Sequence, residues 1–257
     1  MSKKEQIAKI KILAVFKSFL WCVVILLFPI MSGTLSAILS LNTIQTLFLQ
    51  GMFMVFALIP PVVLVLIGKW NLKEIVFPHF DFQGCISALY FIPLLMIFVP
   101  PALKGFYIKS PVYVFGSLFL YLFVGITEEV YFRGIIPKYL KECFSEKEII
   151  LLSSFVFAIG HIASAFSCNS VFEVILSVFN AFIFGWVAIE TVILSKNIIP
   201  VILIHFFFDF ETKIVVMKES ELLIAETVRG ALMLIMAIWL AVVIKKEKEK
   251  QVKEILK

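Results

Sequence analysis

Apolar residues run through this chain in long blocks separated by short polar connections. Each block is close to the ~20 residues that an α-helix needs to cross a bilayer. Predicted helices occupy Ile12–Ile30, Gln45–Ile67, Gly84–Leu103, Pro111–Val130, Glu148–Phe166, Val171–Leu194, Ile198–Val216 and Leu222–Ile244. The pattern therefore predicts an all-α membrane protein, a polytopic bundle of about eight transmembrane helices that forms a single integral membrane domain over residues 1–257.

Composition agrees with this assignment and excludes soluble classes of protein. Hydrophobic residues make up 61% of the chain and charged residues 16%, against roughly 45–50% and about 25% in globular chains. We expect no separate soluble domain and no nucleic-acid partner. Cys22, Cys85, Cys143 and Cys168 lack CxxC spacing, so we interpret them as packing residues rather than as a disulfide or a metal site.

The distribution of lysines predicts how the helices are oriented in the membrane. The two tails and the connections on their side carry most of the lysines, including the six after Ile244. The opposite side has Lys104, Lys109 and Lys218, with Lys213 ambiguous near a helix end. The positive-inside rule therefore predicts that both termini are cytoplasmic. We expect a multi-pass protein of a bacterial plasma membrane.

Ionisable side chains inside the predicted spans concentrate in three short motifs. These read EEVYFR at Glu128 to Arg133, FAIGH at Phe157 to His161, and HFFFD at His205 to Asp209. Inserting a charged group at membrane depth costs roughly 3 kcal/mol, so each such residue is expected to have a partner or a function.

Helical spacing separates the two adjacent glutamates. Residues four apart share a helix face, so Glu129 is predicted to pair with Arg133. Glu128 lies about 100° round the helix, next to Phe132, and has no cation at that spacing. Glu128 is therefore our first candidate for a general base, with Glu129 and Arg133 as a supporting ion pair.

These residue types favour hydrolysis by an activated water molecule. Glu128, assisted by His161, would remove a proton from water, and His205 with Asp209 would stabilise the oxyanion of a tetrahedral intermediate. Zinc bound by Glu128, His161 and His205 is the competing chemistry, although the chain has no HExxH motif. A transporter whose buried carboxylates relay protons is a third hypothesis.

At these three motifs the chain resembles the family of CAAX prenyl endopeptidases and bacteriocin-processing enzymes, abbreviated CPBP and also called Abi. The signatures of that family are EExxxR, FxxxH and HxxxN or HxxxD on separate helices, and all three occur here in that order. The resemblance covers a catalytic core at residues 115–210. It includes NAFIFGWVAIE, in which Ala181 and Gly185 predict a close-packed helix face.

The resemblance implies an intramembrane endopeptidase in which Glu128 and His161 activate water while His205 and Asp209 form the oxyanion site. We favour a metal-independent mechanism with no obligatory cofactor, and zinc is the alternative. The chain has Asp209 where the better-known prenyl proteases have Asn, and an ionised aspartate repels an oxyanion. The oxyanion role therefore requires Asp209 to be protonated or to act through its hold on His205, and we expect the second.

The expected substrate is a peptide or a membrane protein, cleaved near the cytoplasmic side, and the lipid bilayer is the other expected partner. The alternative is a non-catalytic membrane protein on the same fold, such as a bacteriocin self-immunity protein that acts by binding.

Overall fold

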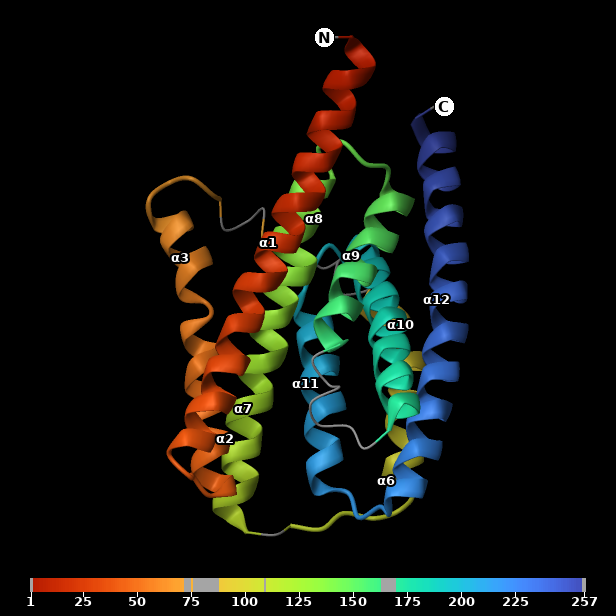
Figure 1. The fold of residues 1–257 in the computed structure, drawn as a ribbon. Helices are drawn as coiled ribbons and strands as arrows, with labels where there is room; N and C mark the ends of the chain where they lie inside the picture. The colour runs from red at the N-terminus through yellow and green to blue at the C-terminus, as the bar shows by residue number, and fades with distance from the viewer. Residues whose placement is uncertain (1, 72–74, 76–87, 109, 163–169, 256–257) are drawn as a thin grey trace.

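The computed structural model of the chain describes residues 2–71, 75, 88–108, 110–162 and 170–255. These residues form a bundle of helices with both termini at the same end (Figure 1). The all-α membrane fold predicted from the sequence is confirmed.

Among the described residues, 5 helical segments are long and apolar enough to cross a membrane. They are α1 (Lys3–Ile38), α2 with α3 (Thr43–Phe56 and Ile59–Leu66), α7 with η2 and α8 (Pro111–Glu129, Val130–Ile135 and Ile136–Leu140), α10 (Val171–Ser195) and α12 (Glu219–Ile255). Shorter elements are η1 (Ala88–Phe98), α6 (Val99–Ala102), α9 (Glu146–Gly160) and α11 (Ile199–Ile214). The predicted spans at Gly84–Leu103 and Glu148–Phe166 lie partly outside the described residues.

Local sequence signals account for where several helices begin and break. Capping boxes formed by Ser2 with Glu5 and by Ser145 with Glu148 start α1 and α9, because side chain and backbone satisfy each other's free hydrogen-bonding groups. The adjacent Pro60 and Pro61 lie in the first turn of α3 and separate it from α2. Proline lacks the N–H that would continue the preceding helix, so the chain breaks there.

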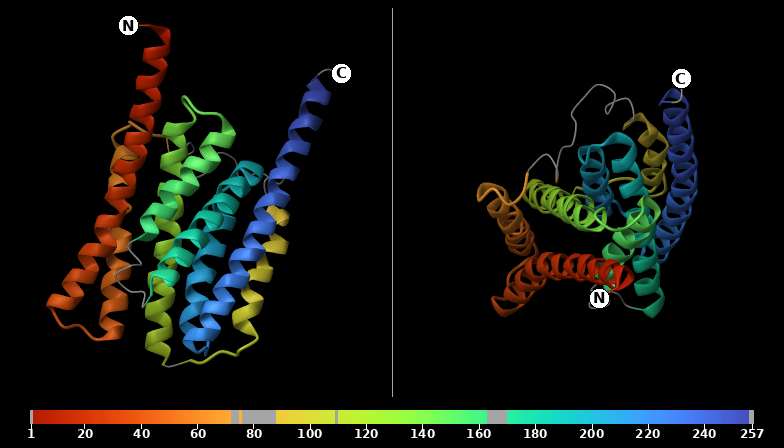
Figure 2. Two further views of the ribbon diagram at one scale, coloured as in Figure 1. Left: turned by 45° about the vertical axis from the view of Figure 1, so that its right-hand side comes forward. Right: turned by 90° about the horizontal axis from the view of Figure 1, so that it is seen from above.

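The HFFFD motif lies on α11, which packs against other helices on several sides and exposes Leu203 and Phe207 on another. This helix packs against α7, η1 and α10, while α10 packs between α9 and α12 and α1 lies across α2, α8 and α9 (Figure 2). The bundle thus brings motifs on α7, α9 and α11 to a common interior region.

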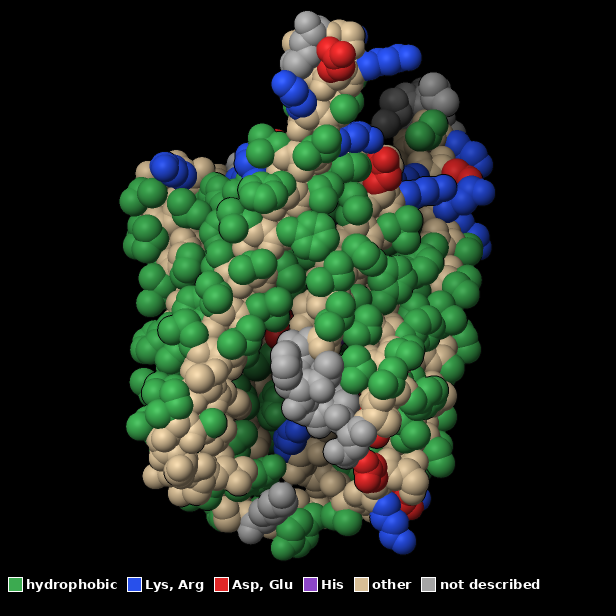
Figure 3. Space-filling view, in the orientation of Figure 1, with side chains coloured by type: hydrophobic (Ala, Val, Ile, Leu, Met, Phe, Trp, Pro, Cys, Tyr) green, Lys and Arg blue, Asp and Glu red, His purple; other side chains and the backbone are tan. Residues whose placement is uncertain are grey.

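The outer surface matches a lipid environment. Large apolar side chains are exposed along the outer faces of the spanning helices, for example Phe16, Leu27, Phe115 and Ile235. Lys and Arg gather at the end that carries both termini (Figure 3). This arrangement is the one that the positive-inside rule associates with cytoplasmic termini.

Candidate active site

Glycine allows the two helices that carry EEVYFR and HFFFD to approach closely. A Cβ atom at Gly125 of α7 would lie 3.0 Å from the carbonyl oxygen of Ile202 and 3.2 Å from the amide nitrogen of Phe206 on α11. Gly125 is one turn before Glu129, and Phe206 adjoins His205. The absence of a side chain at Gly125 therefore lets the glutamates of α7 reach the histidine of α11.

Glu129 contacts α11 with one carboxylate oxygen and a cation of its own helical segment with the other. Its Oε1 lies 2.7 Å from Nδ1 of His205, and its Oε2 lies 3.1 Å from Nε of Arg133. The pairing of Glu129 with Arg133 follows the predicted four-residue spacing. The Nε–H of Arg133 is not aligned for a hydrogen bond, so the contact is an ion pair. Glu129 is fully buried, so it neutralises a cation and orients an imidazole where a low local dielectric strengthens both contacts.

Two further carboxylates face the other nitrogen of the same ring. Nε2 of His205 lies 3.8 Å from Oε2 of Glu128 and 3.5 Å from Oδ2 of Asp209. The Glu128 Oε2 atom is buried and has no hydrogen-bond partner among the described residues. The structure therefore brings three carboxylates, those of Glu128, Glu129 and Asp209, around the imidazole of His205.

His161 approaches from α9, which ends at this depth. The residue is the C-terminal cap of the 15-residue helix, and Nδ1 lies 3.0 Å from the carbonyl oxygen of Phe157. Because a carbonyl only accepts hydrogen bonds, Nδ1 carries the proton and donates it, which leaves Nε2 for a water molecule or substrate. α9 starts at the end of the bundle that carries the termini and runs inward to Gly160. His161, the next residue, therefore lies inside the bundle.

Phe157 is the common aromatic neighbour of the site. Its ring centroid lies 4.5 Å from that of His161 and 5.9 Å from that of His205, and the Arg133 guanidinium lies 4.2 Å from it. The Phe184 ring is 5.0 Å from His205 on the α10 side. These contacts restrict both imidazoles and place the arginine over an aromatic face, where a cation is favoured.

The helix that carries both glutamates changes form directly after them. Residues Val130–Ile135 are π-helical, and the N–H of Ile136 donates to the carbonyl of Tyr131. Pro137 follows and lacks the N–H that would bond to the Arg133 carbonyl, which explains the disturbed hydrogen-bond ladder. Single π turns often occur at functional sites in helices.

Two cavities meet at His161. The larger, of about 890 Å³, is lined by His161, His205 and Asp209 and extends to the exposed Glu219 and Ser220 at the start of α12. The start of α12 lies at the end opposite both termini (Figure 1). The cavity opens away from the end that carries the termini, whereas the sequence led us to expect cleavage near that end.

The smaller cavity, of about 220 Å³, lies on the other side of His161. It is lined by Ile25, Leu26, Pro29, Glu128, Phe132, Gly160 and His161. All of these except Glu128 and His161 are apolar or lack a side chain. The candidate base and the candidate water-activating histidine thus share a wall with a mostly apolar space contributed by α1.

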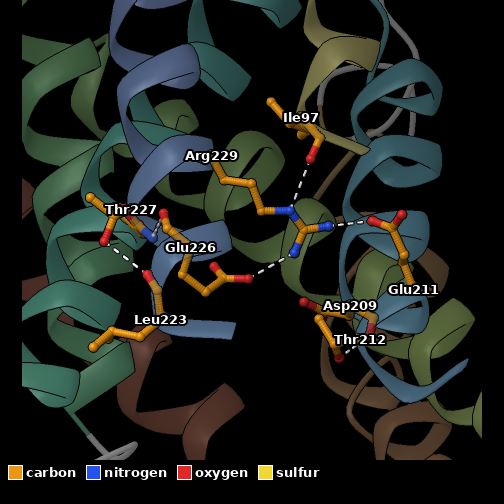
Figure 4. A network of polar contacts seen from close by, with 9 residues as sticks. Ile97, Asp209, Glu211, Thr212, Leu223, Glu226, Thr227 and Arg229 are labelled. Atoms are coloured by element: carbon orange, nitrogen blue, oxygen red, sulfur yellow. Dashed lines mark hydrogen bonds and ion pairs between the residues drawn. The ribbon is translucent and has the colours of Figure 1, made fainter. Parts of the chain in front are cut away.

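A buried arginine holds the far wall of the larger cavity. Arg229 of α12 donates to the Ile97 carbonyl at 2.9 Å and pairs with Glu226 and with Glu211 of α11 (Figure 4). Glu226 and Arg229 are three residues apart and so lie on one face of α12. The network anchors α11 to η1 and α12 near Asp209.

Close packing of α9, α10 and α12 completes the frame. A Cβ atom at Gly185 would lie 3.0 Å from the Ser154 Cα, which agrees with the predicted small-residue face of Ala181 and Gly185. Asn180 donates through Nδ2 to the Glu226 carbonyl at 2.9 Å and so joins α10 to α12.

The described residues do not present a ready zinc site. No group of three or more His, Cys, Asp or Glu side chains among them is arranged to hold a metal ion. Glu128, His161 and His205 therefore do not fit zinc as they stand, because a catalytic zinc needs three converging protein ligands. Cys22 and Cys143 are free thiols, and Cys85 and Cys168 lie outside the described residues.

Sequence reasoning missed two contributions to this site. It assigned Glu129 to Arg133 alone, whereas the same carboxylate also holds His205. It did not include α1, whose Ile25, Leu26 and Pro29 line the small cavity. Neither contact has a signal in local spacing, because each joins segments far apart in the chain.

A comparison with known protein families concerns the segment that holds this site. Residues 110–210 match the family model described as Rce1-like, type II CAAX prenyl endopeptidase Rce1-like. That segment contains all six candidate residues, and the match confirms the resemblance indicated by the three motifs. It supports a CAAX-type intramembrane protease as the general class. No curated protein and no solved structure matches the chain.

Proposed function

From the similarity of residues 110–210 to type II CAAX prenyl endopeptidases, we propose that this chain is an intramembrane endopeptidase that hydrolyses a peptide bond with a water molecule activated by Glu128. The observation that carries the proposal is the Glu128 carboxylate, whose buried Oε2 has no hydrogen bond among the described residues and lies 3.8 Å from Nε2 of an imidazole that Glu129 holds from its other side. A partly buried carboxylate with an oxygen free of hydrogen bonds beside a cavity is suited to accept a proton.

In this mechanism Glu128 and His161 act on the water. Glu128 accepts one proton as the water oxygen attacks the carbonyl carbon, and Nε2 of His161 holds the water through a hydrogen bond. The attack gives a tetrahedral intermediate with a negative oxygen. Its collapse breaks the C–N bond, and the proton held by Glu128 passes to the departing amine.

His205 is the group that we assign to the oxyanion. Glu129 fixes Nδ1, so Nε2 points toward the cavity with its partners Glu128 and Asp209. With several carboxylates nearby, a protonated imidazole is favoured, and its Nε2–H can donate to the developing negative charge. Asp209 then acts by holding that ring rather than by touching the oxyanion.

The large cavity suggests the route by which substrate reaches these groups. Its exposed lining is at the end of the bundle opposite the termini. Together with the predicted cytoplasmic termini, this favours entry from the non-cytoplasmic side. Glu128 lies roughly 26 Å from the Pro111 end of its helix and roughly 18 Å from the Leu140 end, at the ~1.5 Å rise of an α-helix. The bond would thus be cleaved within the membrane.

The decisive experiment compares cells that express the wild-type protein with cells that express Glu128→Gln. Membrane proteins and released peptides are measured by mass spectrometry, and cleavage products are expected only with the wild type. Purified protein in vesicles is then tested on the peptides found, where Glu128→Gln should lower turnover by at least about 10²-fold.

Glu190→Gln is the matched control. Glu190 is a buried glutamate of α10 outside the residues that line the two cavities, so its variant should retain cleavage. If Glu128→Gln left both the products and the cellular phenotype unchanged, the non-catalytic binding alternative would replace the protease.

A further inference from the structure

We propose that the small cavity between α1 and the catalytic glutamate is a specificity pocket, which receives one apolar side chain of the substrate next to the scissile bond. This inference rests on the proposed peptidase function and adds the substrate class that the site selects. The pocket is the space of about 220 Å³ lined by Ile25, Leu26, Pro29, Phe132 and Gly160, with Glu128 and His161 on its wall.

The size of the pocket limits its occupant. An apolar cavity of roughly 150 Å³ holds a benzene molecule, whereas sites for drug-sized ligands are typically about 300–1,000 Å³. A volume of about 220 Å³ is therefore suited to a single Leu, Met or Phe side chain. It is too small for a prenyl chain, which is several isoprene units long.

The chemistry of the lining favours the same occupant. Ile25 is almost fully buried, and Leu26 and Phe132 supply further apolar surface. The site presents one carboxylate and one imidazole, and both belong to the reaction proposed above. An apolar side chain would bury its surface here. An acidic one would lose its hydration next to the Glu128 carboxylate, and a basic one would neutralise the group that the reaction needs as a base.

Position relative to the reacting groups makes the pocket a determinant of the cleavage site. Glu128 lines this pocket, whereas His205 and Asp209 line the large cavity, and His161 lines both. A peptide that places its carbonyl near His205 and Glu128 would direct a neighbouring side chain into the small pocket. The large cavity would hold the rest of the chain.

Pro29 links the pocket to the lipid-facing surface. Its side chain is exposed on α1, although it also lines the pocket. Because proline has no N–H, the Ile25 carbonyl one turn earlier cannot form the regular helical bond to position 29. The same stretch of α1 thus offers apolar walls to a substrate. It also offers the Ile25 carbonyl, which lacks its regular helical bond, to a backbone N–H of the substrate.

Gly160 gives a mild way to reduce the pocket. A Cβ atom there would lie 3.8 Å from Leu26 Cδ2 and from Phe132 Cζ, which is ordinary contact distance. Gly160→Ala should therefore fold and make the pocket smaller by one methyl group. Leu26→Ala enlarges it instead, and Leu27→Ala is the matched control because Leu27 is an exposed neighbour that does not line the pocket.

The test uses a library of quenched-fluorescent peptides in vesicles of phosphatidylcholine and phosphatidylglycerol, with cleavage sites read by mass spectrometry. Wild type should cleave beside Leu, Met or Phe. Gly160→Ala should lower the ratio of cleavage beside Phe to cleavage beside Ala by about 10-fold, and Leu26→Ala should raise it by a similar factor. Identical cleavage profiles in all variants would overturn the pocket while leaving the peptidase intact.

A binding measurement covers the case in which no library peptide is turned over. Peptides that carry a photoreactive leucine analogue are crosslinked to the Glu128→Gln protein, and the attachment points are mapped. Attachment to Ile25, Leu26 or Pro29 is expected. Attachment confined to other positions would contradict the pocket, whereas a failure of the peptidase is seen separately as the absence of Glu128-dependent products in cells.

Discussion

Glu129 of α7 holds the imidazole of His205 on α11 by a contact of 2.7 Å between Oε1 and Nδ1. The same carboxylate pairs with Arg133, so one side chain joins the EEVYFR and HFFFD motifs. The second glutamate of the pair is therefore an orienting group for the histidine as well as the partner of an arginine.

Glu129→Gln should separate orientation from water activation. The amide keeps the size of the side chain but removes the charge that favours a protonated His205 and neutralises Arg133. We expect turnover to fall by on the order of 10²–10⁴-fold, as when the orienting carboxylate of a catalytic histidine is replaced by an amide. Stability should also fall by about 3–5 kcal/mol, because Arg133 stays buried without its counter-charge.

The measurements for Glu129→Gln are steady-state turnover in vesicles and thermal unfolding followed by circular dichroism. Glu190→Gln serves again as the buried control. A variant with normal turnover and lowered stability would mean that Glu129 supports only the fold.

Asp209→Asn should be tolerated much better than Asp209→Leu. The amide can still contact Nε2 of His205, which lies 3.5 Å from Oδ2, and it carries no negative charge to oppose an oxyanion. We expect Asn to keep turnover within about 10-fold of wild type and Leu to lose about 10²-fold or more, by analogy with loss of an oxyanion-site group. Equal losses in the two variants would show that the charge of Asp209 is required.

Access from the end opposite the termini can be measured by cysteine labelling. Ser220→Cys at the mouth of the large cavity and Lys141→Cys near the terminal end are made in a protein whose native cysteines are replaced by serine. A membrane-impermeant maleimide added to intact cells should label position 220 and spare position 141. The reverse pattern would place the cavity mouth in the cytoplasm and would exclude the proposed route of entry.

Chelators should leave cleavage unchanged. This expectation rests on the donor arrangement, since no group of three or more suitable side chains in the described part of the chain converges on one point. Purified protein is assayed after treatment with phenanthroline and with its non-chelating isomer. A loss of turnover with the chelator alone, restored by zinc, would establish the competing metal mechanism.

The sequence predicted the helical membrane fold and the pairing of Glu129 with Arg133 because both depend on local patterns. Apolar blocks mark helices whatever their neighbours, and a spacing of four residues fixes a contact within one helix. The contact of Glu129 with His205 depends on how closely α7 and α11 approach at Gly125. Likewise, α1 lines the small cavity with Ile25, Leu26 and Pro29 because α9 ends beside them at Gly160. The pattern of apolar residues does not specify where α9 ends.

The π turn at Val130–Ile135 makes the length of this helix a constraint in its own right. Such a turn holds one residue more than a regular α-helix does. Removing one residue would therefore restore the α-helix and leave α8 facing as it does now, with Tyr139 Oη still near Trp21 Nε1 on α1, which lies 3.4 Å away. Inserting a further residue would instead turn α8 by about 100° relative to the glutamates, given ~3.6 residues per turn. Related sequences should therefore lose one residue at this turn more readily than they gain one.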